Sequence, residues 1–151
     1  MSIQTPQKKI RSIQKAFSLS PSESTLMLIL ASIFVSLAVL IHIYIWVLES
    51  FLWDKPRGLQ TFNMDSNRAA LTKEMAVNQG LYNLLLAVVA FAGLIALWSG
   101  SLAVAKSLIF AGAGSMAIAG IFLFATSADK RRPALIQLVP PLLGVIAAAL
   151  I

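Results

Sequence analysis

The sequence predicts an all-α integral membrane protein that folds as a four-helix transmembrane bundle. Composition favours this class, because 58% of the 151 residues are hydrophobic, only 12% are charged, and the mean hydropathy is +0.83. A soluble domain contains about 45–50% apolar and about 25% charged residues. Four charge-poor stretches follow one another along the chain, separated by polar or turn-forming residues. Each is close to the roughly 20 residues that a helix needs to cross a bilayer.

Charge and cysteine content exclude several function classes. The net charge of +6 comes from 12 Lys and Arg against 6 Asp and Glu. In a membrane protein such an excess reflects orientation and contact with anionic lipid head groups. Most aromatic residues lie inside the apolar stretches, so we expect the lipid bilayer as a partner and no nucleic acid. The chain has no cysteine, which excludes disulfides and thiol catalysis.

A polar, basic tail precedes the membrane domain. We place this tail at residues 1–22 and the four-span domain at residues 23–151. The tail is either a short amphipathic helix on the membrane surface or a partly ordered segment. The first apolar stretch begins just after it, and we expect Ser22 or Ser24 to cap its helix.

The spans follow from the charge-free stretches. A Ser-Gly-Ser turn signal at residues 99–101 separates the second span from the third. Pro140 and Pro141 predict a kink in the fourth span, because proline cannot donate the backbone hydrogen bond to the residue four positions earlier. The four spans are predicted at about residues 24–50, 75–98, 102–126 and 133–151.

The third span carries a pattern typical of helix packing. Four small residues recur at every fourth position, and such spacing predicts a close helix–helix contact. We call these residues the four-residue stripe; they are Ser107, Ala111, Ser115 and Ala119. Three glycines are expected to add places where another backbone can approach, namely Gly112, Gly114 and Gly120.

The connections differ in length and charge. Residues 54–74 hold seven charged residues, and the second half, residues 66–74, is predicted to form a helix continuous with the second span. Residues 129–133 form a basic cluster that we expect at the membrane surface. Four spans place both termini on one side. The first and third connections hold seven Lys and Arg against five in the tail and second connection, which favours both termini outside.

The first span contains two ionisable residues, His42 and Glu49. Seven residues apart, they lie within about 20° of one helix face and about 10 Å apart along the axis. Polar groups inside hydrocarbon tend to face a bundle interior or a cavity. Two interpretations stay open. Either the pair performs acid–base chemistry or binds a ligand, or Glu49 marks the membrane edge while His42 bonds a neighbouring helix.

The second span opens with a polar run whose amide and phenol groups recur at helical spacing: Asn78, Gln79, Tyr82 and Asn83. Because the first two spans are antiparallel, we expect Asn78 and Gln79 at the depth of Glu49, and Asn83 at about the depth of His42. Interhelical hydrogen bonding alone is the alternative to a ligand site. The predicted ligand-binding residues are His42, Trp46, Glu49, Asn78, Gln79, Tyr82 and Asn83.

Metal and cofactor chemistry are not expected. One His and one Glu, with no Cys and no second His, fall short of the three or four ligands of a metal site. The chain has no phosphate-binding loop, serine-hydrolase triad or haem-attachment signal. The candidate catalytic residues are therefore His42 and Glu49 alone.

Several motifs resemble the family called domain of unknown function 1304, whose members are small, mostly bacterial, four-helix membrane proteins. The resemblance covers most of residues 28–150, and Leu84 departs from it where a glycine is common. It implies four spans, the same polar residues and a bacterial inner membrane, but no established activity. The motifs that carry it are His-Ile-Tyr-Ile-Trp-Val-Leu-Glu at residues 42–49, Trp53, Pro56-Arg57-Gly58, and Asn-Gln-Gly-Leu-Tyr-Asn at residues 78–83.

Three functions remain open from the sequence. The first is a protein that binds or carries a small amphipathic molecule or lipid in a polar pocket between the first two spans. The second is a membrane enzyme in which Glu49 and His42 exchange protons with a lipophilic substrate. The third is an accessory subunit of a larger membrane complex. A homo-oligomer is also open.

Overall fold

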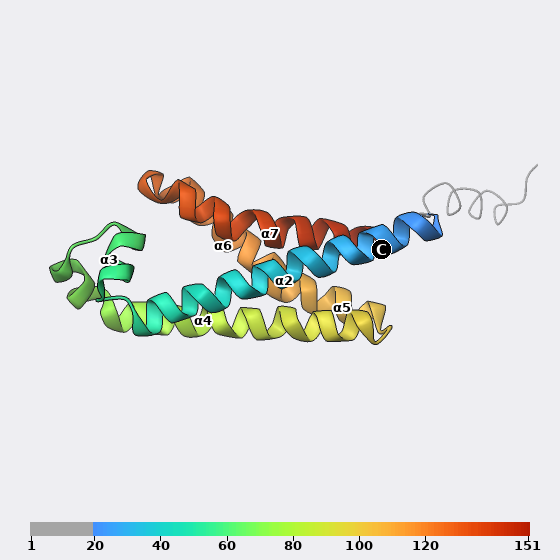
Figure 1. The fold of residues 1–151 in the computed structure, drawn as a ribbon, viewed down its shortest axis with the longest axis horizontal. Coiled ribbons are helices and arrows are strands. Elements are labelled where there is room, and N and C mark those ends of the chain that lie inside the picture. Colours follow the sequence, from blue (N-terminus) through green and yellow to red (C-terminus); the bar gives the residue numbers. More distant parts are fainter. Residues whose placement is uncertain (1–19) are drawn as a thin grey trace, which may run out of the picture.

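The computed structural model describes residues 20–151, which form helices joined by short turns (Figure 1). Four helical segments are long and apolar enough to cross a membrane, so the predicted four-helix class is confirmed. The tail up to residue 19 lies outside the described residues. In chain order the elements are α2 (Pro21–Phe51), α3 (Pro56–Phe62), α4 (Ser66–Trp98), α5 (Leu102–Ile109), the π-helical turn η1 (Phe110–Gly114), α6 (Ser115–Thr126), the short 3₁₀ turn η2 (Ala128–Lys130) and α7 (Arg131–Leu150).

The long helices run alternately in opposite directions. Figure 1 shows α3 and the α6–α7 connection at one end of the bundle, and the start of α2, the α4–α5 turn and the C-terminus at the other. Helix α2 packs against both α4 and α7, α4 packs against α5 and η1, and α6 packs against α7. The first and third connections therefore share one end of the molecule.

Small residues fill the interior, and large apolar residues cover the outside. Alanine is the commonest buried residue of the described chain, while leucine, isoleucine, valine and phenylalanine side chains are exposed along the spans. Lipid tails are as apolar as these side chains, so close packing of small-residue faces holds membrane helices together. On α4 the inward positions follow alternating steps of three and four, the spacing of a coiled-coil face. We call them the α4 seam: Ala76, Gly80, Asn83, Ala87, Ala90, Leu94 and Leu97.

Helix α2 begins earlier than predicted, and its cap is Ser20 rather than Ser22 or Ser24. The Ser20 hydroxyl accepts a hydrogen bond from the Glu23 backbone N–H at 3.3 Å, and the Glu23 carboxylate accepts one from the Ser20 backbone N–H at 2.7 Å. This reciprocal arrangement is a capping box, which requires Glu three residues after the capping Ser. Ser20 meets that requirement, and Pro21 suits the first helical position.

The predicted role of the four-residue stripe in the third span is wrong. All four of its side chains are exposed, and the inward face of this span consists of Ala105, Ile109, Gly112, Ala113, Met116, Ala117 and Gly120. The stripe's two hydroxyls bond carbonyls of their own helix, from Ser107 to Ala103 at 3.0 Å and from Ser115 to Ala111 at 2.6 Å. A serine at a lipid-facing position can make its hydroxyl hydrogen bond within its own helix in this way. Small residue size alone therefore does not identify the packed face.

Two of the three predicted glycine contacts are confirmed. A Cβ atom on Gly112 would come within 2.6 Å of the Ala90 backbone nitrogen, and one on Gly120 within 2.8 Å of Leu138 Cβ. Gly114, by contrast, has no atom of a neighbouring helix within 4 Å of its ideal Cβ position. The π-helical turn η1 thus presents Gly112 to α4 and turns Gly114 away from it.

The sequence predicts an irregular backbone at two places, the turn at residues 99–101 and the two prolines of the fourth span. The predicted turn before the third span is present, and Gly100 adopts a φ of 82°, a conformation that glycine tolerates best. Helix α7 extends from Arg131 to Leu150 with Pro140 and Pro141 both buried within it, and the kink at these prolines stays a prediction. Both prolines are thus part of the helix packing.

The first connection folds back against the ends of α2 and α4. Gly58 of α3 lies against the Leu52 carbonyl, where there is no room for a side chain. Lys73 Nζ of α4 donates a hydrogen bond to Asp54 Oδ2 at 2.7 Å. This bond lowers the pKa of Asp54 below its ordinary value, because it favours the charged carboxylate. The predicted continuity of residues 66–74 with the second span is confirmed, since α4 starts at Ser66.

Candidate functional site

Glu49 and Asn83 meet across the contact between α2 and α4. Asn83 Nδ2 donates a hydrogen bond to Glu49 Oε2 at 2.8 Å. Glu49 is only 4% exposed, and Asn83 is half-buried. The same amide nitrogen lies 3.3 Å from the Gln79 backbone carbonyl. A buried carboxyl group needs such a donor, because burial without one is costly.

The close approach of the two helices depends on Gly80. A Cβ atom at Gly80 would lie 2.5 Å from Ser50 Oγ and 3.2 Å from Glu49 Cβ. Because glycine carries no side chain, the end of α2 packs directly on the α4 backbone. Asn83 lies one turn further along the α4 seam, where its side chain reaches the Glu49 carboxyl group. The predicted pairing of Asn83 with the depth of His42 is therefore wrong, because the close packing at Gly80 sets α4 about one turn differently along α2.

His42 is buried and bonds to its own helix. Its ring is 1% exposed, and Nδ1 lies 2.9 Å from the Ala38 carbonyl oxygen. A carbonyl only accepts hydrogen bonds, so Nδ1 carries the proton. His42 and Glu49 both lie on the inward face of α2, as their spacing predicts. They do not pair with each other: His42 bonds to Ala38, and Glu49 bonds to Asn83. Among residues 20–151, no buried side-chain nitrogen or oxygen lacks a partner.

The other predicted residues lie outside this contact. Asn78, Gln79 and Tyr82 are exposed, and Trp46 is half-buried with its ring 5.5 Å from that of Phe51. Successive residues of a helix are rotated by about 100°. Since Gly80 faces α2, the side chains of Asn78 and Gln79 point away from that helix. The structure therefore joins Glu49 and Asn83 and does not bring the remaining side chains to them. Their assignment to one ligand-binding site stays a prediction.

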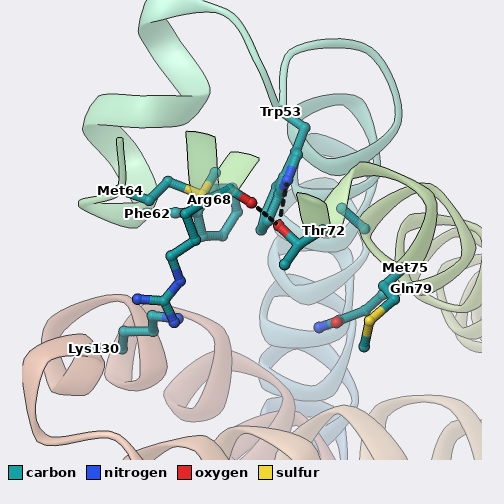
Figure 2. A pocket seen from close by; sticks show the side chains of 9 residues that line it. Trp53, Phe62, Met64, Arg68, Thr72, Met75, Gln79 and Lys130 are labelled. Atoms are coloured by element: carbon teal, nitrogen blue, oxygen red, sulfur yellow. Dashed lines mark hydrogen bonds between the residues drawn. The ribbon is translucent and has the colours of Figure 1, made fainter. Parts of the chain in front are cut away.

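A cavity of about 170 Å³ lies at the end of the bundle formed by the first and third connections (Figure 2). It includes one predicted site residue, Gln79. The remaining lining residues come from the end of α2, the first connection, the first turns of α4 and the start of the fourth span. They are Trp53, Phe62, Met64, Arg68, Thr72, Met75, Ala76 and Lys130.

The apolar wall of the cavity is held in place by specific contacts. Trp53 Nε1 donates a hydrogen bond to Thr72 Oγ1 at 3.2 Å, and Thr72 Oγ1 donates to the Arg68 carbonyl at 2.8 Å (Figure 2). The rings of Trp53 and Phe62 lie 4.7 Å apart between centroids. The indole is therefore fixed against α4, and α3 contributes the second ring.

Two cationic side chains line the same cavity, and the sequence analysis did not select them. Arg68 comes from the first turn of α4 and Lys130 from the connection before α7. They are 62 positions apart in sequence, so no local motif connects them. One feature of the sequence could have pointed to them. The first and third connections are predicted on the same side of the membrane, so their basic residues can come into contact.

A second hollow is formed by one helix alone. It is lined by Glu74, Met75, Val77, Asn78 and Leu81, all from one helix, and it lies open on the surface of α4. Asn78 and Gln79 therefore line different hollows although they are adjacent in sequence.

Comparison with known proteins identifies a family but no activity. The sequence model of the family described as "Protein of unknown function (DUF1304)" matches residues 36–149. This match covers most of the chain, so the chain belongs to that family, and the resemblance found in the sequence is confirmed. No curated protein and no solved structure matches.

Proposed function

We propose that this member of the DUF1304 family binds or carries a small amphipathic molecule or lipid in the cavity at the ends of its first two spans. The observation that carries the proposal is the cavity at the membrane end of α2 and α4. Aromatic and thioether side chains form one part of its lining, and a guanidinium, an ammonium and an amide form another. A ligand with an apolar and a polar part matches such a lining. The proposal places the protein in the bacterial inner membrane.

The arrangement of His42 and Glu49 favours binding over acid–base catalysis. Each of the two side chains is hydrogen-bonded within the protein, to Ala38 and to Asn83 respectively. Neither residue lines the cavity. In this proposal Glu49 stabilises the contact between α2 and α4, His42 is held within α2, and the ligand binds in the cavity at the helix ends.

Native mass spectrometry of the detergent-purified full chain tests the proposal. Gln79→Trp fills the cavity with a larger side chain, and Asn78→Trp is the matched control on the adjacent, outward position. We expect one retained amphiphile on the parent and on Asn78→Trp, and its loss from Gln79→Trp. Equal retention by both variants, or no retained molecule on the parent, would contradict the proposal.

The same experiment separates the two alternatives. A stoichiometric protein partner in place of a small molecule would favour the accessory subunit. Conversion of the retained molecule, abolished by Glu49→Gln or by His42→Ala, would favour the membrane enzyme. Each of these outcomes would replace the binding proposal.

A further inference from the structure

The cavity between the first and third connections brings together two positive charges that form no salt bridge with any of residues 20–151. Arg68 and Lys130 both line it, and Figure 2 shows their side chains directed toward each other. The salt bridges within residues 20–151 involve Asp54 with Lys55 and with Lys73, and neither includes Arg68 or Lys130. The nearby Asp65 carboxylate accepts a hydrogen bond from the Arg68 backbone N–H at 2.8 Å, as the cap of α4.

Two like charges in one small cavity repel each other, and a bound anion removes that repulsion. Lys130 is half-buried and Arg68 is exposed, so the two charges lie at the open side of the cavity. The side-chain hydrogen bonds found for residues 20–151 leave both cationic groups available to an outside acceptor. The charge of the cavity is therefore complementary to an anion.

The volume of the cavity indicates which part of a ligand it holds. Pockets that enclose a whole drug-sized ligand measure about 300–1,000 Å³, and this one measures about 170 Å³. It can enclose a head group but not a hydrocarbon chain. Met75 lines the cavity and is also 73% exposed, so an attached chain can leave past it along the apolar outer face of α4.

We infer that this cavity binds the phosphate group of an anionic amphiphile, and that the side chains of Arg68 and Lys130 contact the phosphate. The inference rests on the proposed function and names the ligand class for the same site. Guanidinium forms paired hydrogen bonds with phosphate oxygens, and lysine contributes a compact charge to phosphate sites. Phosphate has enough oxygen atoms to accept from both groups, which reach it from separate elements. The bound phosphate then links α4 to the start of α7.

Binding to the detergent-purified full chain, followed by native mass spectrometry, tests this inference. The probes are phosphatidylglycerol, diacylglycerol with the same acyl chains, and glycerol phosphate without chains. The variants are Arg68→Gln, Lys130→Gln and the conservative Arg68→Lys. Arg132→Gln is the matched control, because it removes one charge beside Lys130 at an exposed residue that does not line the cavity. Circular dichroism melting verifies that each variant is folded.

We expect phosphatidylglycerol to bind at least about tenfold more tightly than diacylglycerol, and each glutamine variant in the cavity to lose about tenfold. Arg68→Lys retains part of the affinity, and Arg132→Gln retains all of it. We expect glycerol phosphate to bind more weakly than phosphatidylglycerol, because the acyl chains contribute apolar contact; equally tight binding would mean that the ligand is a soluble phosphate ester and not an amphiphile.

Three further results would overturn the inference. Equal binding of diacylglycerol and phosphatidylglycerol would show that the phosphate is not recognised, although the protein would still bind an amphiphile. An equal loss in Arg132→Gln and Lys130→Gln would reduce the effect to general surface charge. Binding of none of the probes would overturn this inference, whereas the proposed function is contradicted only if the purified protein retains no amphiphile.

Discussion

At the scale of single residues, the hydrogen bond between Asn83 and Glu49 is the main polar contact between the first two spans. It joins an amide on the α4 seam to a carboxyl group that is 4% exposed. Hydrogen bonds between membrane helices contribute about 0.6 kcal/mol on average and at most about 1.7 kcal/mol. The contact therefore adds modestly to stability, and its larger effect is to fix how α2 and α4 are aligned.

A double-mutant cycle on this pair is the first prediction. Glu49→Ala and Asn83→Ala each remove one partner, and we expect a coupling of about 0.6–1.7 kcal/mol in the free energy of unfolding. The measurement is reversible unfolding in mixed detergent micelles.

Asn78→Ala provides the control for this cycle, because Asn78 is exposed on the same helix. Its effect should add to that of Glu49→Ala within about 0.5 kcal/mol. If Asn78 couples to Glu49 as strongly as Asn83 does, both amides belong to one network with the carboxyl group. The arrangement described above would then be incorrect.

At the scale of the helices, the contact between η1 and α4 depends on one glycine. Any side chain on Gly112 would meet the Ala90 backbone, which cannot move aside as a flexible side chain can. Gly114 belongs to the same turn and faces open space. The two positions therefore separate the effect of helix contact from the effect of glycine on the helix itself.

The second prediction compares the same substitution at these two glycines. Gly112→Ala should lower the free energy of unfolding by about 1–3 kcal/mol, since it overpacks a backbone contact. Gly114→Ala should be neutral or stabilise the helix by up to about 1 kcal/mol, because alanine is the better helix former. Ala111→Leu, on the exposed stripe, should change stability by less than about 0.5 kcal/mol. Equal stability of Gly112→Ala and the parent would rule out this close contact.

At the scale of the whole molecule, four crossings place the connections on alternating membrane sides. The start of α2, the α4–α5 turn and the C-terminus lie at one end of the bundle (Figure 1). The first and third connections, which line the cavity together, lie at the other. The function proposed above depends on this pairing, because Arg68 and Lys130 meet only if the two connections share a side.

Labelling of single cysteines tests this arrangement, and the chain has no native cysteine to interfere. Ser22→Cys and Ser99→Cys should react with a membrane-impermeant reagent from one side of the membrane. Gln60→Cys and Asp129→Cys should react from the other side. Intact cells and inverted vesicles provide the two measurements. Any other grouping would mean that the number of spans is not four.

The sequence by itself determined the fold class and the inward face of the first helix. Apolar stretches of bilayer length require helices, because a backbone in hydrocarbon must satisfy its own hydrogen bonds. The seven-residue spacing of His42 and Glu49 placed both on one side of α2, where both are buried. These features depend on composition and on helical periodicity, which are local properties of the chain.

The tertiary structure alone decided which small residues pack and which polar residues meet. Gly80 and Gly112 pack while Gly114 and the four-residue stripe do not, because the rotation of each helix depends on all of its neighbours. The polar run of α4 divides between the Asn83 contact and two separate hollows for the same reason. The cavity joins Arg68 and Lys130 from connections that are distant in sequence. No local sequence pattern predicts that these two residues lie close together, because this depends on how the four helices pack against one another.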